Sequence, residues 1–106
     1  MQHLAALRHE KIAFITGPLH LKSAVARKEA FLQSMAEISL EAGARSVVEG
    51  DHTIEGGMAA LSELLSAAPR PTAVLCSNDM TAIGVMRKSY EMGLVIPRDL
   101  SLIGLD

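Results

Sequence analysis

The side chains best suited to binding in this chain stand where apolar segments end. Asn78 follows the apolar segment 72–76, and Asp106 follows the similar segment 101–105. His52 follows a third, shorter segment of the same kind. Open parallel sheets bind small molecules at the carboxyl ends of their strands. This spacing therefore predicts a binding site that offers amide, carboxylate and imidazole groups.

Arg27 lies on the apolar stripe of a helix expected to run from Ser23, its N-cap, to about Ala42. The stripe continues through Phe31 and Met35, so Arg27 shares the face that packs on the sheet. A cation in the first turn is disfavoured by the helix dipole and requires an anionic or hydroxyl-rich partner at the strand ends. The alternative is an arginine that extends past the helix end into solvent. The pattern alone leaves both interpretations open.

The segment Ser77-Asn78-Asp79 has a simpler interpretation as a helix cap. Ser and Asx residues before a helix commonly accept bonds from its first N–H groups, each contributing about 1 kcal/mol. Two adjacent Asx residues exceed what one cap needs, so we expect Asp79 to cap and Asn78 to face a ligand. Asp51 has the same alternative as a cap, and His52 has one as a solvated surface residue.

A sheet is needed to bring these side chains together, and the chain has the pattern of one. Buried-strand segments are expected at residues 12–16, 46–49, 72–76 and 101–105. Amphipathic helical segments alternate with them, at about 3–9, 23–42 and 79–92, and Gly43 and Gly93 fit the positions just past two helix ends. A further helix follows the turn at 50–53, has Met58, Leu61, Leu64 and Leu65 on one face, and is stopped by Pro69 and Pro71. Such connections predict an α/β fold: a three-layer, doubly wound, mostly parallel sheet of about four strands in the order 2-1-3-4.

The composition excludes several classes of protein. The 106 residues suffice for one domain with an aliphatic core, since 49% are apolar and only 3% aromatic. A net charge of −2 does not fit a self-contained nucleic-acid-binding module, which usually carries a basic face. The single Cys76 rules out an internal disulfide and fits a reducing, cytoplasmic setting. No apolar run approaches the roughly 20 residues of a membrane span.

The sequence contains no recognisable enzyme, metal or cofactor motif. The four histidines lack the spacing of a zinc site. Cys76 lies inside an apolar strand and is interpreted as a core residue. The loop at residues 17–21 matches neither a dinucleotide fingerprint nor a phosphate-binding loop. We therefore expect a non-catalytic binding domain without a cofactor.

At these residues the chain resembles the lactose-repressor (LacI-type) family of bacterial transcription regulators. The similar runs are residues 3–18, 26–31 and 49–51, and the longest is 71–84, which continues with 93–106. The resemblance covers essentially the whole chain. It implies that residues 1–106 form the C-terminal subdomain, incomplete, of a periplasmic-binding-protein-like effector core. The family's helix-turn-helix and N-terminal subdomain are then expected to lie outside this chain.

The resemblance also implies roles for five residues. Arg27 matches the arginine that grips the effector, Asn78 and Asp106 match its polar partners, and Ser23 matches a side chain that can also contact the ligand. His52 stands where relatives commonly place an aromatic ring that stacks on the effector. That effector is usually a sugar, a sugar phosphate or a nucleobase. Because His52 replaces a larger ring, the class of ligand stays open.

The implied function is effector sensing in a cytoplasmic transcription repressor. Effector binding would close two subdomains and change how a dimer presents DNA-binding heads that lie outside this chain. Ala82, Ile83 and Met86 lie where the family builds part of its subunit interface, so we expect a homodimer or a higher oligomer. The alternative is a lobe of a periplasmic sugar-binding protein that feeds a transporter. The first 60 or so residues of the gene would distinguish a helix-turn-helix from a secretory signal.

Overall fold

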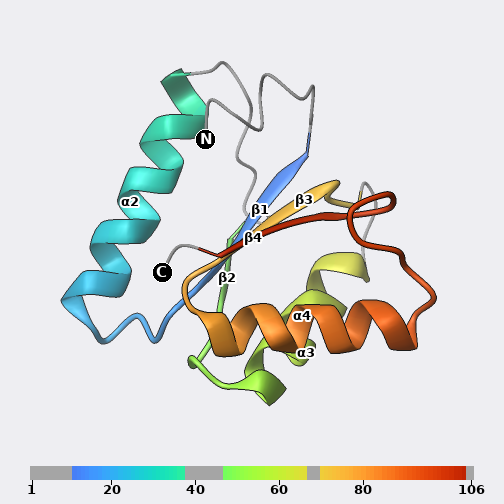
Figure 1. The fold of residues 1–106 in the computed structure, drawn as a ribbon. Helices are drawn as coiled ribbons and strands as arrows, with labels where there is room; N and C mark the ends of the chain where they lie inside the picture. Colours follow the sequence, from blue (N-terminus) through green and yellow to red (C-terminus); the bar gives the residue numbers. More distant parts are fainter. Residues whose placement is uncertain (1–10, 38–46, 67–69, 105–106) are drawn as a thin grey trace.

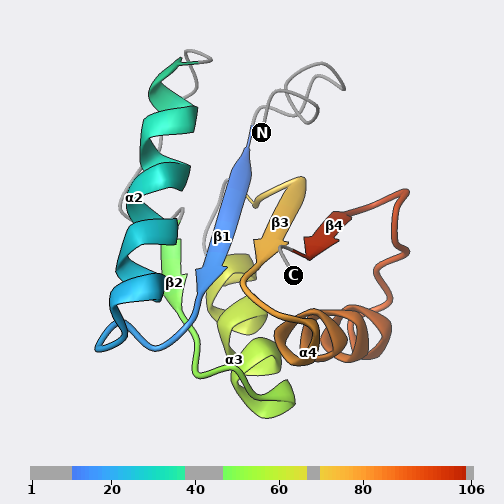
Figure 2. The same ribbon diagram turned by 60° about the vertical axis from the view of Figure 1, so that its left-hand side comes forward.

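The computed structural model describes residues 11–37, 47–66 and 70–104. Helices cover both faces of a parallel sheet, with α2 on one side and α3 and α4 on the other (Figures 1 and 2). The strands are β1 (Ile12–Thr16), β2 (Val47–Glu49), β3 (Ala73–Cys76) and β4 (Ser101–Gly104). The helices are α2 (Lys22–Glu37), α3 (Ile54–Leu65) and α4 (Asp79–Glu91). The predicted α/β class is confirmed.

The strand order is β2-β1-β3-β4, as the sequence predicted. All three strand pairings are parallel, so the arrowheads in Figure 2 point toward one edge of the sheet. The order reverses between β1 and β3, which places their carboxyl ends side by side. Beyond the strands, the amide of Gly50 donates to Thr16 O at 2.9 Å, and that of Ser77 donates to Ile15 O at 3.1 Å. These bonds hold the strand ends together where the site was expected.

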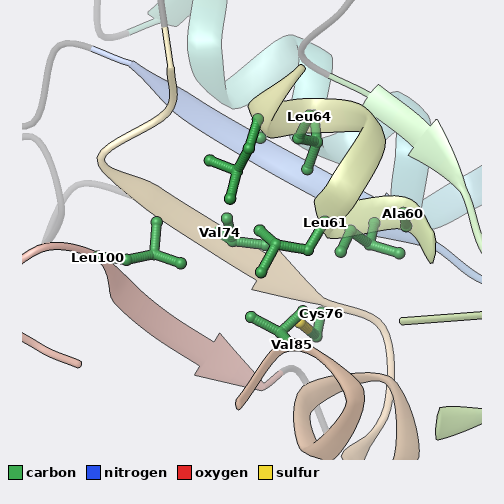
Figure 3. Packing of buried hydrophobic residues seen from close by; sticks show 10 residues of the cluster. Ala60, Leu61, Leu64, Val74, Cys76, Val85 and Leu100 are labelled. Carbon is green, nitrogen blue, oxygen red and sulfur yellow. The ribbon is translucent and has the colours of Figure 1, made fainter. Parts of the chain in front are cut away.

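Alternate residues of the central strands enter two separate cores. Phe14 and Leu75 pack toward α2, where the rings of Phe14 and Phe31 lie 5.4 Å apart between centroids. Figure 3 shows the larger core, on the opposite face. Its buried residues are Ala13, Ile15, Ala60, Leu61, Leu64, Leu65, Val74, Cys76, Val85 and Leu100. The continuous apolar strands of the sequence are thus explained by a sheet covered on both faces.

Helices α3 and α4 approach each other backbone to backbone at two glycines. A Cβ atom on Gly84 would lie 2.1 Å from Ile54 O, and one on Gly57 would lie 2.4 Å from Thr81 O. No real side chain tolerates either distance, so only glycine permits this crossing. Because α3 and α4 are locked together near their N-termini, the residues that precede them are held in a fixed relation.

The capping residues of all three helices differ from the sequence predictions, although α4 begins at Asp79 as predicted. Helix α2 begins at Lys22, so Ser23 lies inside its first turn and is not the N-cap. Thr53, not Asp51, caps α3, and its side chain accepts a bond from the amide of Gly56. Asn78, not Asp79, caps α4. The local sequence offered two polar candidates before each of α3 and α4, and only the folded structure distinguishes between them.

The C-terminal end of α4 follows the prediction. Gly93 has a φ of +75°, the left-handed conformation that glycine adopts without a steric penalty. Its amide donates to Tyr90 O at 3.1 Å, and the amide of Leu94 donates to Ser89 O at 2.8 Å. This is the hydrogen-bond pattern of a Schellman cap. The predicted helix at 3–9, the end of the second helix near Ala42 and Gly43, and Pro69 all lie outside the described residues.

Candidate functional site

The candidate site lies at the carboxyl edge of the sheet, over the ends of β1, β2 and β3. There the loop after β1 begins at Gly17, the turn into α3 carries His52, and the turn into α4 carries Ser77 and Asn78. The second turn of α2 brings Arg27 to the same edge. Four segments that are far apart in the chain therefore meet at one place.

Arg27 reaches the end of β3. It is the sixth residue of α2 and therefore lies in the second turn, whereas the sequence had suggested the first turn. The residue as a whole is exposed, but its Nη1 donates to the carbonyl oxygen of Ser77 at 3.0 Å. The guanidinium thus has a partner at the strand ends and does not simply extend into solvent. This contact places a cation beside the turn that carries Asn78.

The amide of Asn78 makes contacts to two elements. Its Oδ1 accepts from the backbone amide of Thr81 at 2.9 Å and from the Thr81 hydroxyl at 2.6 Å. Its Nδ2 donates to the carbonyl oxygen of His52 at 3.2 Å. The expectation that Asp79 would cap and leave Asn78 for a ligand was therefore wrong about the cap. Asn78 caps α4 and also ties it to the turn before α3.

His52 has a backbone conformation that is unusual for a residue with a side chain. Its φ is +66°, in the left-handed region, and it is half-buried. Its imidazole lies against Gly17, where a Cβ atom would stand 2.2 Å from the ring Nε2. The alternative of a freely solvated histidine does not describe this ring, which packs on the end of β1.

Asp51 supports the turn on the other side of His52. Its Oδ1 accepts from the Thr53 hydroxyl at 2.6 Å and from the Thr53 amide at 3.0 Å. The hydrogen bonds from the Thr53 side chain and then from its backbone hold the pKa of Asp51 below the ordinary 3.8. Asp51 does not cap α3 directly, but it orients the threonine that does.

The two remaining predicted residues are Ser23 and Asp106. Ser23 is exposed in the first turn of α2, four residues before Arg27, so both lie on the same side of that helix. Asp106 lies outside the described residues. The structure therefore brings Arg27, His52 and Asn78 to one edge and places Ser23 on the helix that supplies Arg27.

Ser77 was expected beside Asn78 at this edge, but no role beyond helix capping was predicted for it. It is 1% exposed, its carbonyl receives the bond from Arg27, and its hydroxyl has no hydrogen-bond partner within the described part of the chain. The available signal was a small polar residue directly after a buried strand. That signal was assigned entirely to helix capping.

An open hollow of about 550 Å³ lies beside this edge, between β2 and α3. It is lined by Pro18, Val48, Glu49, Gly50, Asp51, Gly56, Ala59, Ala60 and Glu63. The predicted binding residues do not line it. Its carboxylates form no metal site, because no group of three or more His, Cys, Asp or Glu among the described residues could hold a metal ion. None of the helices that the structure describes could cross a membrane.

The whole chain is similar to known proteins in both sequence and fold. Residues 1–106 match the family described as periplasmic binding protein-like domain. This chain belongs to that family. The match covers the whole chain, and the relatives that follow are LacI-type regulators.

The curated relatives are repressors that are longer than this chain. The chain is 38% identical over 105 residues to the HTH-type transcriptional repressor PurR of Klebsiella pneumoniae, covering 99% of this chain and 31% of that protein. It is 37% identical to the Escherichia coli O1:K1 protein of the same name, with the same coverage. The chain thus spans about a third of the length of these relatives.

Solved structures of LacI-type regulators share the fold closely. A regulator from Mycobacterium smegmatis has a TM-score of 0.90 at 35% identity, covering 97% of this chain and 39% of that one. An Escherichia coli sugar-binding regulator complexed with phosphate has a TM-score of 0.93 at 28% identity, covering 98% and 37%. The CelR–cellobiose complex has a TM-score of 0.91 at 30% identity, covering 97% and 32%. The resemblance to the LacI type and the periplasmic-binding-protein-like fold are therefore confirmed.

Proposed function

We propose that this chain is the C-terminal lobe of the effector-binding region of a cytoplasmic LacI-type transcription repressor, and that it senses a small molecule without catalysis. The observation that carries the proposal is the convergence of Arg27, His52 and Asn78 at the carboxyl edge, next to the point where the strand order reverses. In open α/β sheets this position is where ligands bind. The similarity to repressors favours this function over the transporter alternative.

The effector would contact Arg27, His52 and Ser23, with Asn78 at the margin of the site and Asp106 as a carboxylate. A guanidinium has five N–H donors, so an arginine can bind a hydroxyl, a carbonyl or a phosphate oxygen together with contacts to the protein. Imidazole and hydroxyl groups can both donate and accept. This set suits a sugar, a sugar phosphate or a nucleobase. One structural relative is a cellobiose complex and another a phosphate complex, which supports ligands of this kind.

A single lobe covers only one side of a ligand. We infer that a second lobe, outside this chain, closes over the effector and excludes water. Ligand sites of this kind bury most of the ligand surface, so the chain alone should bind weakly or undetectably. Micromolar binding of a sugar to the 106-residue chain in calorimetry would contradict this inference.

The outward face of α4 supports association of two copies. Met86 is 47% exposed and Tyr90 is 86% exposed, and the half-buried Ile83 lies one turn before Met86 in α4. Exposed apolar surface of this kind commonly marks an interface. We propose a homodimer, or a higher oligomer, that uses α4, with DNA contacted through a separate domain. A monomer in sedimentation at high concentration would contradict the proposal.

Ligand-dependent thermal stability of the complete protein tests the effector site. Cellobiose, glucose 6-phosphate and adenine represent the three ligand classes, and a true effector raises the melting temperature by mass action. Arg27→Ala should abolish the increase. Arg70→Ala is the matched control, because Arg70 is exposed just before β3, at the opposite end of that strand from the site. An Arg27→Ala protein that responds like the unmodified protein would refute the assignment of the site.

A further inference from the structure

The amide group of Asn78 has little capacity left for a ligand. Its oxygen accepts two bonds from Thr81, and its nitrogen donates to the carbonyl oxygen of His52. The orientation of the amide is fixed by its partners, because a backbone N–H can only donate and a carbonyl can only accept. One N–H of Nδ2 is the only donor for which no bond is described. Asn78 is therefore better placed to hold other groups than to bind an effector itself.

Asn78 holds the backbone of His52, which has an unusual conformation. A left-handed φ of +66° is disfavoured for any residue with a Cβ, so His52 needs contacts that keep it there. Asn78 holds its carbonyl from one side. On the other side Thr53 is held by Asp51 and caps α3. Both contacts act on the backbone and leave the imidazole unbonded in the described structure.

The position of the imidazole follows from this backbone. The ring rests on Gly17, and a Cβ at that residue would lie 2.2 Å from Nε2 and 2.7 Å from Cε1. If His52 changed to a negative φ, its ring would no longer lie against Gly17. Two features together therefore place the ring. One is the hydrogen bond from Asn78 Nδ2 to His52 O, here called the clamp, and the other is the absence of a side chain at Gly17.

We propose that Asn78 is a positioning residue, which presents the imidazole of His52 to the effector at the end of β1 rather than contacting the effector through its own amide. This inference rests on the proposed function of the edge as an effector site. It assigns the recognition step to His52 and makes it depend on a hydrogen bond between the N-terminal ends of α3 and α4. Arg27 makes a different contact, to the carbonyl oxygen of Ser77.

A ligand-free measurement tests the clamp. In NMR spectra of the 106-residue chain, nuclear Overhauser contacts should join the ring protons of His52 to the Hα protons of Gly17. Asn78→Ser and Asn78→Asp both keep a capping oxygen for Thr81. The ionised aspartate has no donor for His52 O, and the serine hydroxyl is one bond shorter than the amide that reaches it. Both variants should lose these contacts while the amide signals of α4 persist. Agreement between them excludes an effect of the added charge, and exposed His20 is the internal reference.

Retention of the His52–Gly17 contacts in both variants would overturn the proposal, whatever the protein binds. This test does not depend on the effector, so a failure of the proposed function in the ligand screen would be recognised separately. A merely structural role of Asn78 as a cap would leave the contacts unchanged, because serine and aspartate preserve the cap.

A double-mutant cycle on ligand affinity separates positioning from direct contact. Glycine adopts a left-handed φ freely, so in the His52→Gly background the clamp has nothing to hold. With whichever of cellobiose, glucose 6-phosphate or adenine stabilises the complete protein, Asn78→Ser should weaken binding by roughly tenfold when His52 is present. In the His52→Gly background the same change should alter affinity by less than about twofold. Equal losses in both backgrounds would show that Asn78 contacts the effector directly, and would overturn the proposal.

Discussion

Substitution of Gly84 by alanine tests the close crossing of α3 and α4. The added Cβ would lie 2.1 Å from Ile54 O, 2.9 Å from Met58 N and 3.0 Å from the Gly57 Cα. All three atoms belong to the backbone of α3, so no flexible side chain can move away. The two helices must separate, and this separation also weakens the contacts that their side chains make in the larger core.

The magnitude follows from two opposing terms. Overpacking of a tight contact costs about 1–3 kcal/mol, and a clash between backbones belongs at the upper end. Alanine in a helix recovers roughly 1 kcal/mol relative to glycine. We therefore expect the free energy of unfolding to fall by about 2 kcal/mol, since the clash outweighs the gain in helix propensity. For a domain of this size that corresponds to a fall in the melting temperature of roughly 10 °C.

Thermal unfolding followed by circular dichroism measures this change, and urea unfolding gives the free energy directly. Gly104→Ala is the matched control, because among the described residues its Cβ would meet only Asp79 Oδ1, at 3.9 Å, which is an ordinary contact. The control should change stability by no more than about 0.5 kcal/mol. If Gly84→Ala melts at or above the temperature of the unmodified chain, the helices do not cross as closely as described and the reasoning fails.

Three further predictions concern single groups. Ser89→Ala should raise the free energy of unfolding in urea by about 1 kcal/mol, because the buried Ser89 hydroxyl has no partner among the described residues; a loss of stability would reveal a bond that the variant removes. Burial raises the pKa of the Cys76 thiol to about 12, so iodoacetamide at pH 8 should alkylate it only after unfolding, as mass spectrometry would register. The backbone bond from Val95, followed by the bond from Arg98, lowers the pKa of Asp99 below its ordinary 3.8. Its contribution to stability is therefore complete above that value and is lost as the pH falls through the lower folded value. Asp99→Asn should make acid unfolding less steep below about pH 4, and an unchanged acid transition would contradict this.

Local sequence was sufficient to predict the strands and their order. A run such as residues 12–15 is apolar at every position, which is typical of a strand covered on both faces. Helical segments between such strands impose right-handed parallel crossovers. From there the carboxyl edge follows, and with it the approach of Arg27 and Asn78 to the same place. Gly93 at the end of α4 was equally predictable, because only the turn itself determines its φ.

The choice between neighbouring polar residues could not be predicted in this way. Asn78 and Asp79 are both good caps, and so are Asp51 and Thr53. The selection involves contacts outside each segment: the side chain of Asn78, the cap of α4, also donates to His52 O, 26 positions away. A single segment does not contain that information.

The sequence alone thus determined the alternation of buried strands and helices, the order of the sheet and the edge at which its polar residues gather. These depend on periodicity and on the length of connections, which are properties of each segment. Only the tertiary structure decided that Arg27 binds the Ser77 carbonyl, that His52 takes a left-handed conformation over Gly17, and that Asn78 fastens it there. Those contacts join residues 26 to 50 positions apart, so they exist only once the helices have packed on the sheet.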